Sequence, residues 1–200
     1  MSSIRAYRAS DRDQVYDICV RTARAGDDAT GVYSRDDLMP DLYAAPYCAL
    51  EPELAFVLDD GGTAVGYIIA TADTRKFVER WRHEWLPAFA ERHPLTSDLT
   101  SAEKNHILRG VHPEQMLIPD VDDYPAHLHI DLLPQARGRG HGRALLQTLR
   151  SALAASGVLG LHLSMDPANR SARAFYDRLG FHPLPSSRVD APVLGIATSD

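Results

Sequence analysis

A chain of 200 residues, of which 44% are hydrophobic, can bury one core well but hardly two. Its 27 acidic residues outnumber the 21 lysines and arginines, and the net charge of -6 argues against nucleic acid as a general partner. No stretch approaches the ~18 consecutive apolar residues of a transmembrane helix, and the two cysteines are too few for a disulfide framework. We therefore expect a single cytoplasmic domain over residues 1–200, with neither nucleic acid nor a membrane as partner.

The first third of the chain predicts one helix and one hairpin. Apolar residues recur at helical spacing within residues 11–25, and Gly26 ends the pattern. Two β-rich runs, 54–58 and 64–71, flank a turn of aspartates and glycines. This arrangement predicts an antiparallel hairpin in which Gly66 marks a bulge.

The middle of the chain predicts helices separated by loops. Apolar residues return every three or four positions from 76 to 92, where Pro87 suggests a kink. A second helix is expected near 101–108, while the proline-rich stretch 93–125 is typical mainly of loop. Together these segments form an expected helical and loop insertion at about 74–124.

The final third predicts alternating strands and helices. A strand at 127–133, a helix at 140–155 and a strand at 161–165 are followed by a helix at 170–179 and a last strand at 193–197. A strand, crossover helix and strand in succession indicate a parallel pair inside an otherwise antiparallel sheet. The predicted class is therefore α/β (α+β), with a mixed, mostly antiparallel central sheet and flanking helices.

A glycine loop, residues 135–143, joins the strand at 127–133 to its helix. Its glycines let successive backbone N–H groups and the helix dipole converge on a pyrophosphate. The spacing of Gly138, Gly140 and Gly142 does not match G-x-G-x-x-G, and no Lys followed by Ser or Thr comes next, which disfavours Rossmann and Walker sites. A flexible turn with solvated arginines remains an alternative. An RGG-type RNA segment is disfavoured by the regular helix that follows.

The pattern Q-x-x-G-x-G, formed by Gln135, Gly138 and Gly140, resembles the coenzyme A loop of the GNAT acetyltransferase superfamily. A second motif of that family follows in order, Asn-Arg-Ser-Ala-Arg-Ala-Phe-Tyr at 169–176 and Leu-Gly-Phe at 179–181. The two motifs together are more specific than either alone. The resemblance implies the GNAT fold, in which the parallel strand pair splays apart.

A closer resemblance rests on three further segments. The runs 49–58 and 66–73, and the Trp-Leu-Pro at 85–87, are similar to the acetyltransferase-like C-terminal domain of eukaryotic O-GlcNAc hydrolases (O-GlcNAcase). Since this sequence contains no hydrolase domain, we expect a free-standing, bacterial-type relative of that domain.

The resemblance implies acetyl-coenzyme A (acetyl-CoA) as cofactor, with its pyrophosphate at the glycine loop and its pantetheine arm between the splayed strands. Backbone groups near Leu132 and Leu133 would hydrogen-bond the arm. Asn169 would contact it too, although an N-cap is its alternative role. The residues expected to bind the cofactor are Leu132, Leu133, Gln135, Arg137, Gly138, Arg139, Gly140, His141, Gly142, Arg143, Asn169, Ser171 and Tyr176.

The resemblance also implies a catalytic acid. Tyr176 matches the family's tyrosine that protonates the leaving thiolate, and a phenol of pKa ~10 stays protonated at neutral pH beside a thiol of pKa ~8.5. Simple packing beside Phe175 is the alternative.

For the base, His127, His129 and Asp131 share one face of an extended strand, and His129 and Asp131 are our candidates. The residues just before the strand, Asp122, Asp123 and Tyr124, are alternatives. The strand face could instead be hydrogen-bonded or solvated, and a water chain could replace any of these residues. The H-x-H pair has no identifiable third ligand, so we expect no metal.

Asp27, Asp28 and Tyr33 would border the acetyl end of the cleft in this fold, where acidic groups attract a cationic amine. A solvated turn is the alternative for these residues. The predicted function is an acetyl-CoA-dependent N-acetyltransferase acting on an amine of a small molecule or protein. The alternative is a non-catalytic acetyl-CoA-binding or protein-interaction module. A homodimer is left open.

Overall fold

A seven-stranded mixed sheet forms the centre of the protein, whose computed structural model describes residues 2–199. The strands lie in the order β1-β2-β3-β4-β5-β7-β6, and all neighbours are antiparallel except β4 and β5. Their bounds are β1 Ser2–Ala6, β2 Ala55–Asp60, β3 Thr63–Thr71, β4 Ala126–Leu132, β5 Gly160–Ser164, β6 His182–Pro183 and β7 Val193–Ala197. The predicted fold class is confirmed.

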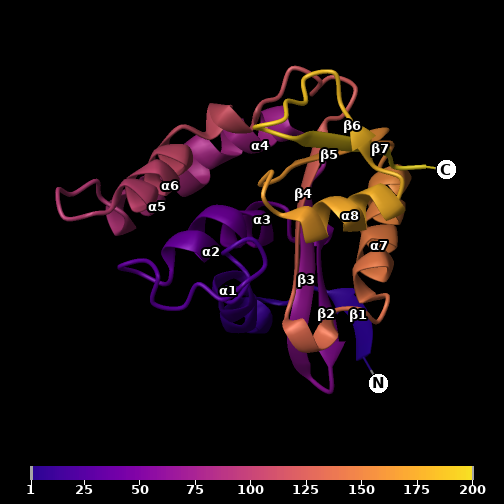
Figure 1. The fold of residues 1–200 in the computed structure, drawn as a ribbon, viewed down its shortest axis with the longest axis horizontal. Helices are drawn as coiled ribbons and strands as arrows, with labels where there is room; N and C mark the ends of the chain where they lie inside the picture. Colours follow the sequence, from indigo (N-terminus) through magenta and orange to yellow (C-terminus); the bar gives the residue numbers. More distant parts are fainter. Residues whose placement is uncertain (1, 200) are drawn as a thin grey trace.

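Helices cover both faces of the sheet (Figure 1). Side chains alternate along β3, so that Tyr67 and Ile69 enter one core while Ile68 and Ala70 enter the other. The first core packs against the helices from α1 to α6, and the second packs against α7 and α8. The helix bounds are α1 Arg12–Val20, α2 Leu38–Tyr43, α3 Ala45–Leu50, α4 Thr74–Arg80, α5 Leu86–Arg92, α6 Ser101–Val111, α7 His141–Ala155 and α8 Arg170–Arg178.

The insertion between β3 and β4 packs onto the first core. A π-helical turn, Trp81–Trp85, separates α4 from α5, and Pro87 follows it in the first turn of α5. The buried Trp81 donates from its indole Nε1 to the Gly110 carbonyl in α6 at 2.9 Å. Phe89 is also buried and lies so close to Gly110 that a Cβ there would come within 2.2 Å of its ring. Trp81 and Phe89 therefore serve packing inside the insertion.

Asp41 joins the insertion to the rest of the fold. Its buried carboxylate accepts hydrogen bonds from the Tyr16 hydroxyl of α1, from Arg92 Nε at 2.8 Å and from His93 Nε2 at 2.9 Å. Asp37, Asp41 and His93 bring ligand-type atoms within 4.8 Å of one another. Because three donors already occupy the Asp41 oxygens, we interpret this group as a structural junction between α1, α2 and α5.

The parallel strands β4 and β5 pair only where they begin. Ala126 is opposite Leu161 and His127 is opposite His162, and residues 2–199 contain no further pairing between these strands. β5 then pairs with β7 on its other side. From residue 128 onward, the edge of β4 that faces β5 is therefore open.

Several predicted boundaries need correction. The first helix ends at Val20 rather than at residue 25, because the Thr22 hydroxyl bonds back to the Ile18 carbonyl at 2.7 Å and the chain then turns. The strand β1 and the helices α2 and α3 were not predicted, whereas the helix expected near 101–108 is α6, Ser101–Val111. The predicted bulge is present, since the register between β2 and β3 shifts beside Gly66.

Candidate active site

The glycine loop presents a run of free backbone donors at the start of α7. Gly138 and Gly140 adopt positive φ angles of 72° and 84°, which side chains other than glycine rarely tolerate. In the described part of the chain, the backbone N–H groups of residues 138–143 have no protein acceptor. Since unpaired N–H groups at a helix N-terminus attract anions, this loop fits a pyrophosphate.

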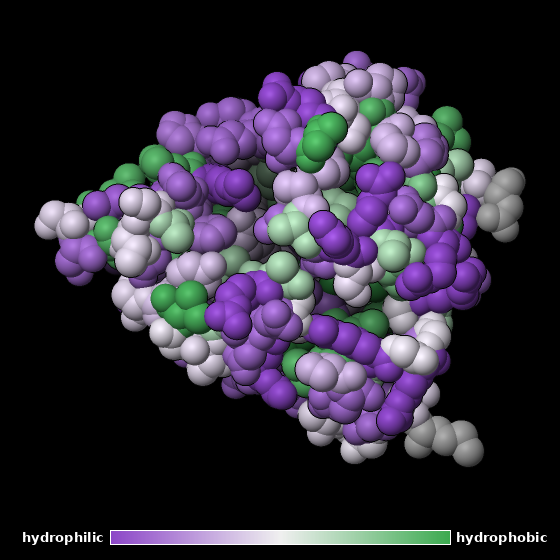
Figure 2. Space-filling view, in the orientation of Figure 1, coloured by the Kyte–Doolittle hydropathy of each residue, from purple (hydrophilic) through white to green (hydrophobic). Residues whose placement is uncertain are grey.

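The arginines of the loop have two different environments. Arg137 is held in place, because its Nε donates to the Leu132 carbonyl at 2.8 Å and its NH2 group donates to the Gly26 carbonyl at 2.6 Å. Arg139 and Arg143 are exposed, and Gln135 is exposed at the loop's start. Arg137 therefore fixes the loop, whereas Arg139 and Arg143 are available to a bound anion. Hydrophilic side chains surround this region of the surface (Figure 2).

Gly142 sets the distance between α7 and α8. A Cβ at this position would lie 3.0 Å from the ring of Phe175 and 3.4 Å from a methyl group of Leu132. The absent side chain thus lets the start of α7 approach α8 and the end of β4 closely.

The open edge of β4 presents main-chain groups of alternate residues. The Leu133 N–H donates to the Val65 carbonyl of β3 at 3.0 Å. In an antiparallel ladder the groups of alternate residues point to opposite sides, so Ile130 and Leu132 direct their N–H and C=O groups away from β3. The N–H of Leu133 is thus already bonded within the sheet, and Ile130 joins Leu132 in facing the gap toward β5.

Tyr176 lies in the second core with its hydroxyl unbonded in the described residues. It is 8% exposed, and its ring packs against Phe175 and Phe181 with centroid distances of 5.2 Å. Burial, and secondarily the negative charge of Asp131, raise the pKa of its hydroxyl. The phenol is therefore held protonated at neutral pH, the form an acid requires.

The predicted titratable face of β4 is brought together with three hydroxyl side chains. His127 lies between Thr74 and Tyr47, and the Tyr47 hydroxyl also contacts Nε2 of His129 at 3.1 Å. Further along the same face, Asp131 accepts a hydrogen bond from the Tyr67 hydroxyl at 2.7 Å. Burial raises the pKa of the Asp131 carboxyl and lowers that of His129 to about 4, so His129 is neutral at pH 7.

The remaining predicted cofactor residues lie at the start of α8. Asn169 accepts a hydrogen bond from the Ala172 N–H at 3.0 Å and is the N-cap of α8, which was the alternative role considered for it. Ser171 is exposed in the first helical turn. The capping bond of Asn169 uses its side-chain oxygen.

The predicted acceptor residues fall into two environments. Asp28 accepts from the N–H and hydroxyl of Thr30 in an exposed turn, and Asp27 is exposed nearby. The structure gives neither carboxylate a contact with the β4 face. Tyr33, however, reaches that face indirectly, through two more side chains.

Tyr33 is connected to His129 by an aromatic series. Its hydroxyl lies 3.3 Å from Nε2 of His106, and Nδ1 of the same imidazole lies 3.3 Å from the Tyr43 hydroxyl. The Tyr43 ring is 5.7 Å from the ring of His129. Arg109 also reaches the Tyr43 hydroxyl, at 3.4 Å. This series lies between α2, α6 and β4.

Tyr43, Tyr47, Thr74 and His106 were not predicted as site residues. Tyr43 and Tyr47 lie on α2 and α3, short helices that have no clear apolar period. Their spacing of i and i+4 was the available signal, but the break at Ala44 places them on different helices. Their role depends on contacts with β4, far away in sequence.

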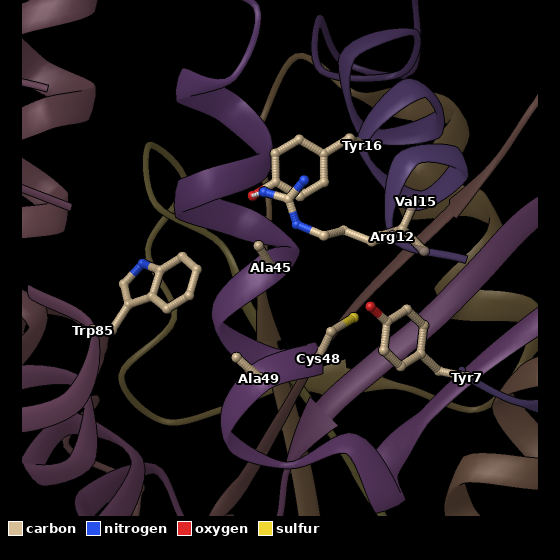
Figure 3. A pocket seen from close by; sticks show the side chains of 8 residues that line it. All are labelled: Tyr7, Arg12, Val15, Tyr16, Ala45, Cys48, Ala49 and Trp85. Atoms are coloured by element: carbon tan, nitrogen blue, oxygen red, sulfur yellow. Dashed lines mark hydrogen bonds between the residues drawn. The ribbon is translucent and has the colours of Figure 1, made fainter. Parts of the chain in front are cut away.

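Two pockets lie away from Tyr176. One, of about 110 Å³, is bordered by α1 and α3, and in Figure 3 the Cys48 thiol and the Tyr7 hydroxyl point toward each other within it. Arg12 is its charged group and lies over the Tyr16 ring at 4.2 Å from the centroid. The other, of about 370 Å³, is bordered by Leu133 and Gln135 but contains none of the proposed catalytic side chains. The candidate site therefore comprises the β4 edge and the glycine loop.

Buried histidines predict a loss of stability in mild acid. Burial lowers the pKa values of His127 and His162, and that of His129 to about 4, whereas a histidine in the unfolded chain titrates near pH ~6.5. Below that pH the unfolded chain binds more protons than the folded chain. The free energy of unfolding should then fall by about 1.4 kcal/mol per pH unit for each group, until the pH reaches its folded pKa.

Urea unfolding between about pH 7 and pH 5 measures this slope. The carboxyl of Asp41, whose pKa is lowered from 3.8, contributes only at lower pH. Burial raises the pKa values of the Asp131 and Glu51 carboxyls, which opposes the fall, so Asp131→Asn and Glu51→Gln backgrounds isolate the histidine slope. His83→Gln, which removes an exposed histidine, should leave the slope unchanged. A stability that stays constant across this range would contradict the assignment of neutral buried histidines.

The model of the acetyltransferase (GNAT) family matches residues 13–181 of this chain. The matched region includes the glycine loop, the open edge of β4 and Tyr176. The chain belongs to the GNAT acetyltransferase family. The resemblance inferred from the two sequence motifs is thus confirmed.

Solved structures of this family share the fold over the whole GNAT domain. The structure of SsHAT is 50% identical, with a TM-score of 0.92, and the alignment covers 100% of this chain and 99% of that one. PaiA N-acetyltransferase from Thermoplasma acidophilum, in complex with coenzyme A, has a TM-score of 0.61 at 13% identity, with coverage of 98% and 99%. At that identity the likeness shows the fold alone.

Two curated relatives support the closer resemblance. Protein O-GlcNAcase of Rattus norvegicus and that of Mus musculus are each 27% identical over 185 residues, which is 89% of this chain. The GNAT domain spans only 20% of the length of either relative. Separately, none of the helices within residues 2–199 combines the length and hydropathy that a membrane crossing requires.

Proposed function

We propose that this GNAT domain is an acetyl-CoA-dependent N-acetyltransferase that transfers acetyl directly to an amine. The observation that carries the proposal is the run of unpaired backbone N–H groups at residues 138–143, next to the open edge of β4. Unpaired donors of this kind fit a pyrophosphate, and an open strand edge fits the amide groups of a pantetheine arm. PaiA N-acetyltransferase from Thermoplasma acidophilum, which shares the fold, was solved in complex with coenzyme A, and this supports coenzyme A as the kind of ligand we propose.

The chain's own groups can bind and orient the cofactor along this path. The loop amides, with Arg139 and Arg143, would hold the pyrophosphate, and main-chain groups of Leu132 and Ile130 would hold the arm. Acetyl-CoA supplies an activated thioester. One of the β4 N–H groups that face the gap would donate to the thioester oxygen as negative charge develops on it.

Tyr176 would protonate the departing sulfur. The amine nitrogen bonds to the acetyl carbon, the carbon–sulfur bond breaks, and the Tyr176 hydroxyl proton passes to the thiolate. The buried position of the phenol and its raised pKa keep that proton available. A base must remove a proton from the amine, and His129 and Asp131 are its candidates.

The proposal treats residues 1–200 as one GNAT domain with an insertion at about 74–124, since the insertion shares the first core. The unpaired buried cysteines, Cys19 and Cys48, are compatible with a reducing compartment, so we place the enzyme in the cytoplasm. Tyr33 and Tyr43 border the side from which an acceptor would approach His129.

Tyr176→Phe should lower the rate of thiol release about 100-fold, because the ring is retained and only the acid is lost. Free thiol is measured with acetyl-CoA and a panel of amines, alongside calorimetric binding of acetyl-CoA to both proteins. The dissociation constant should stay within about twofold of the wild-type value, since the ring that packs against Phe175 and Phe181 is retained and only the hydroxyl is removed.

Two outcomes would contradict the proposal. A rate unchanged in Tyr176→Phe would remove this residue from the acid role. If wild-type protein binds acetyl-CoA but none of the amines causes thiol release, the domain is instead a non-catalytic binding module.

A further inference from the structure

Four side chains from three elements form a continuous hydrogen-bonded chain beside the open edge of β4. His127 lies between Thr74 of α4 and Tyr47 of α3, with Nδ1 2.7 Å from the threonine Oγ1 and Nε2 2.7 Å from the tyrosine hydroxyl. The same hydroxyl lies 3.1 Å from Nε2 of His129. We call these four residues the histidine–tyrosine chain. Each imidazole and each hydroxyl in this chain can donate or accept, so the donor-to-acceptor direction of its hydrogen bonds must be set by a group at one end.

A backbone carbonyl sets that direction. Thr74 Oγ1 lies 2.7 Å from the Pro125 oxygen, which can only accept. Two oxygens at this distance require a proton between them, so the threonine hydroxyl donates to Pro125. Its single proton is thereby used, and Thr74 must accept from His127. His127 therefore has its proton on Nδ1.

The remaining protons follow in order. Burial lowers the pKa values of His127 and His129, so both rings are neutral and each has one N–H. Nε2 of His127 is then an acceptor, and the Tyr47 hydroxyl donates to it. Since Tyr47 has only this proton, it must accept from His129, whose proton is therefore on Nε2. The lone pair of His129 is left on Nδ1, which has no partner in the described residues.

We propose that Nδ1 of His129 is the general base that takes the proton of the acceptor amine, and that Tyr47, His127 and Thr74 are positioning residues that hold its tautomer. This inference rests on the proposed acetyltransferase function. As the amine nitrogen bonds to the acetyl carbon, its N–H bond breaks and the proton passes to Nδ1. The resulting imidazolium keeps its Nε2–H bond to Tyr47 and releases the proton to water after the product leaves.

The other candidate base has a different position. Asp131 accepts from the Tyr67 hydroxyl at 2.7 Å, and burial raises the pKa of its carboxyl. One of its oxygens is thus already engaged within the sheet, whereas Nδ1 of His129 has no partner in the described residues. We therefore assign Asp131 to holding the Tyr67 side chain, and His129 to the amine.

Histidine tautomers can be read directly by NMR of 15N-histidine-labelled protein, with no substrate present. We expect the proton of His127 on Nδ1 and that of His129 on Nε2. Thr74→Val removes the one acceptor that residues 2–199 offer to the His127 Nδ1–H. The direction of every hydrogen bond in the histidine–tyrosine chain should then reverse and place the His129 proton on Nδ1. Thr74→Ser keeps the hydroxyl and should keep the wild-type tautomers. Wild-type His129 with its proton on Nδ1 would overturn the proposal.

A second experiment measures the rate of thiol release from acetyl-CoA, with the amine that wild-type protein acetylates fastest. His129→Gln keeps an N–H donor to Tyr47 but has no base, and should lower kcat about 100-fold. Thr74→Val should lower kcat roughly tenfold and Thr74→Ser should restore it, with acetyl-CoA binding by calorimetry within about twofold in all three variants. A kcat at the wild-type value in His129→Gln would overturn the role of His129 while leaving the acetyltransferase function intact. If the tautomers are as predicted but no amine causes thiol release from acetyl-CoA, the proposed function is overturned, and the role of His129 as base with it.

Discussion

Gly140→Val should weaken binding of coenzyme A at least about 100-fold, equivalent to about 2.7 kcal/mol. Gly140 has a φ of +84°, a conformation that valine adopts only with strain, and no heavy atom beyond its two chain neighbours lies within 4 Å of the Cβ it would add. The substitution therefore acts by distorting the loop, not by a collision. Because the backbone N–H groups of residues 138–143 are the binding groups, a changed backbone removes their convergence. Calorimetric titration with coenzyme A measures the loss.

Gly61→Val is a matched control for this substitution. Gly61 has a φ of +65° and equally open surroundings, but it lies in the turn between β2 and β3. The two variants should be destabilised to a similar extent, and only Gly140→Val should lose binding. Equal affinity of the two variants would show that the pyrophosphate does not contact this loop.

Asp41→Ala should lower the free energy of unfolding by about 3 to 5 kcal/mol, because it leaves buried polar partners unpaired. Asp41 is 1% exposed, and it accepts from Tyr16, Arg92 and His93, which come from α1, from α5 and from the residue after α5. Loss of the carboxylate therefore weakens the attachment of the insertion to the sheet. Urea unfolding followed by circular dichroism measures the change.

The control for this junction is an exposed ion pair in the same region. Glu84 pairs with Arg80 at 2.8 Å, and both side chains are largely exposed. Glu84→Ala should change the free energy of unfolding by less than about 0.5 kcal/mol. If Asp41→Ala lowers the free energy of unfolding no more than Glu84→Ala does, Asp41 is not a structural junction.

The final third of the fold could be predicted because its signals are local. The last strand was predicted at 193–197 and is Val193–Ala197, and the helix expected at 140–155 is His141–Ala155. Leucines at helical spacing and the glycines before them determine α7 within one continuous segment. The splayed strand pair came from the family resemblance, and the structure shows β4 and β5 pairing only at their start.

The side chains around the candidate base could not be predicted, since they meet only in the folded chain. Tyr47 is separated from His127 by 80 residues, and Thr74 from it by 53. Tyr47 lies in a short helix with a weak local signal, Thr74 lies at the very start of α4, and nothing in the pattern of β4 indicates its partners. The direction of the hydrogen-bonded chain depends on one carbonyl, that of Pro125, whose position follows from the path of the insertion back into β4.

The structure places the predicted cofactor residues in different environments. The family motif gives Leu132 and Leu133 the same expected role. In the structure the Leu133 N–H is hydrogen-bonded to β3, whereas the main-chain groups of Leu132 face the gap. Arg137 contacts the Leu132 and Gly26 carbonyls, whereas Arg139 is exposed. A sequence motif gives the order of the residues, but the direction of each backbone N–H and C=O group follows only from the register between β3 and β4.

The most direct test of the account is an NMR titration of 15N-labelled protein with coenzyme A, in which each backbone amide reports separately. We expect saturable shifts of the amide signals of residues 138–143 and of Leu132, with smaller changes in the α1–α3 pocket. Saturable shifts confined to the amide signals of other residues, or an unchanged spectrum at millimolar coenzyme A, would contradict binding of coenzyme A at the glycine loop.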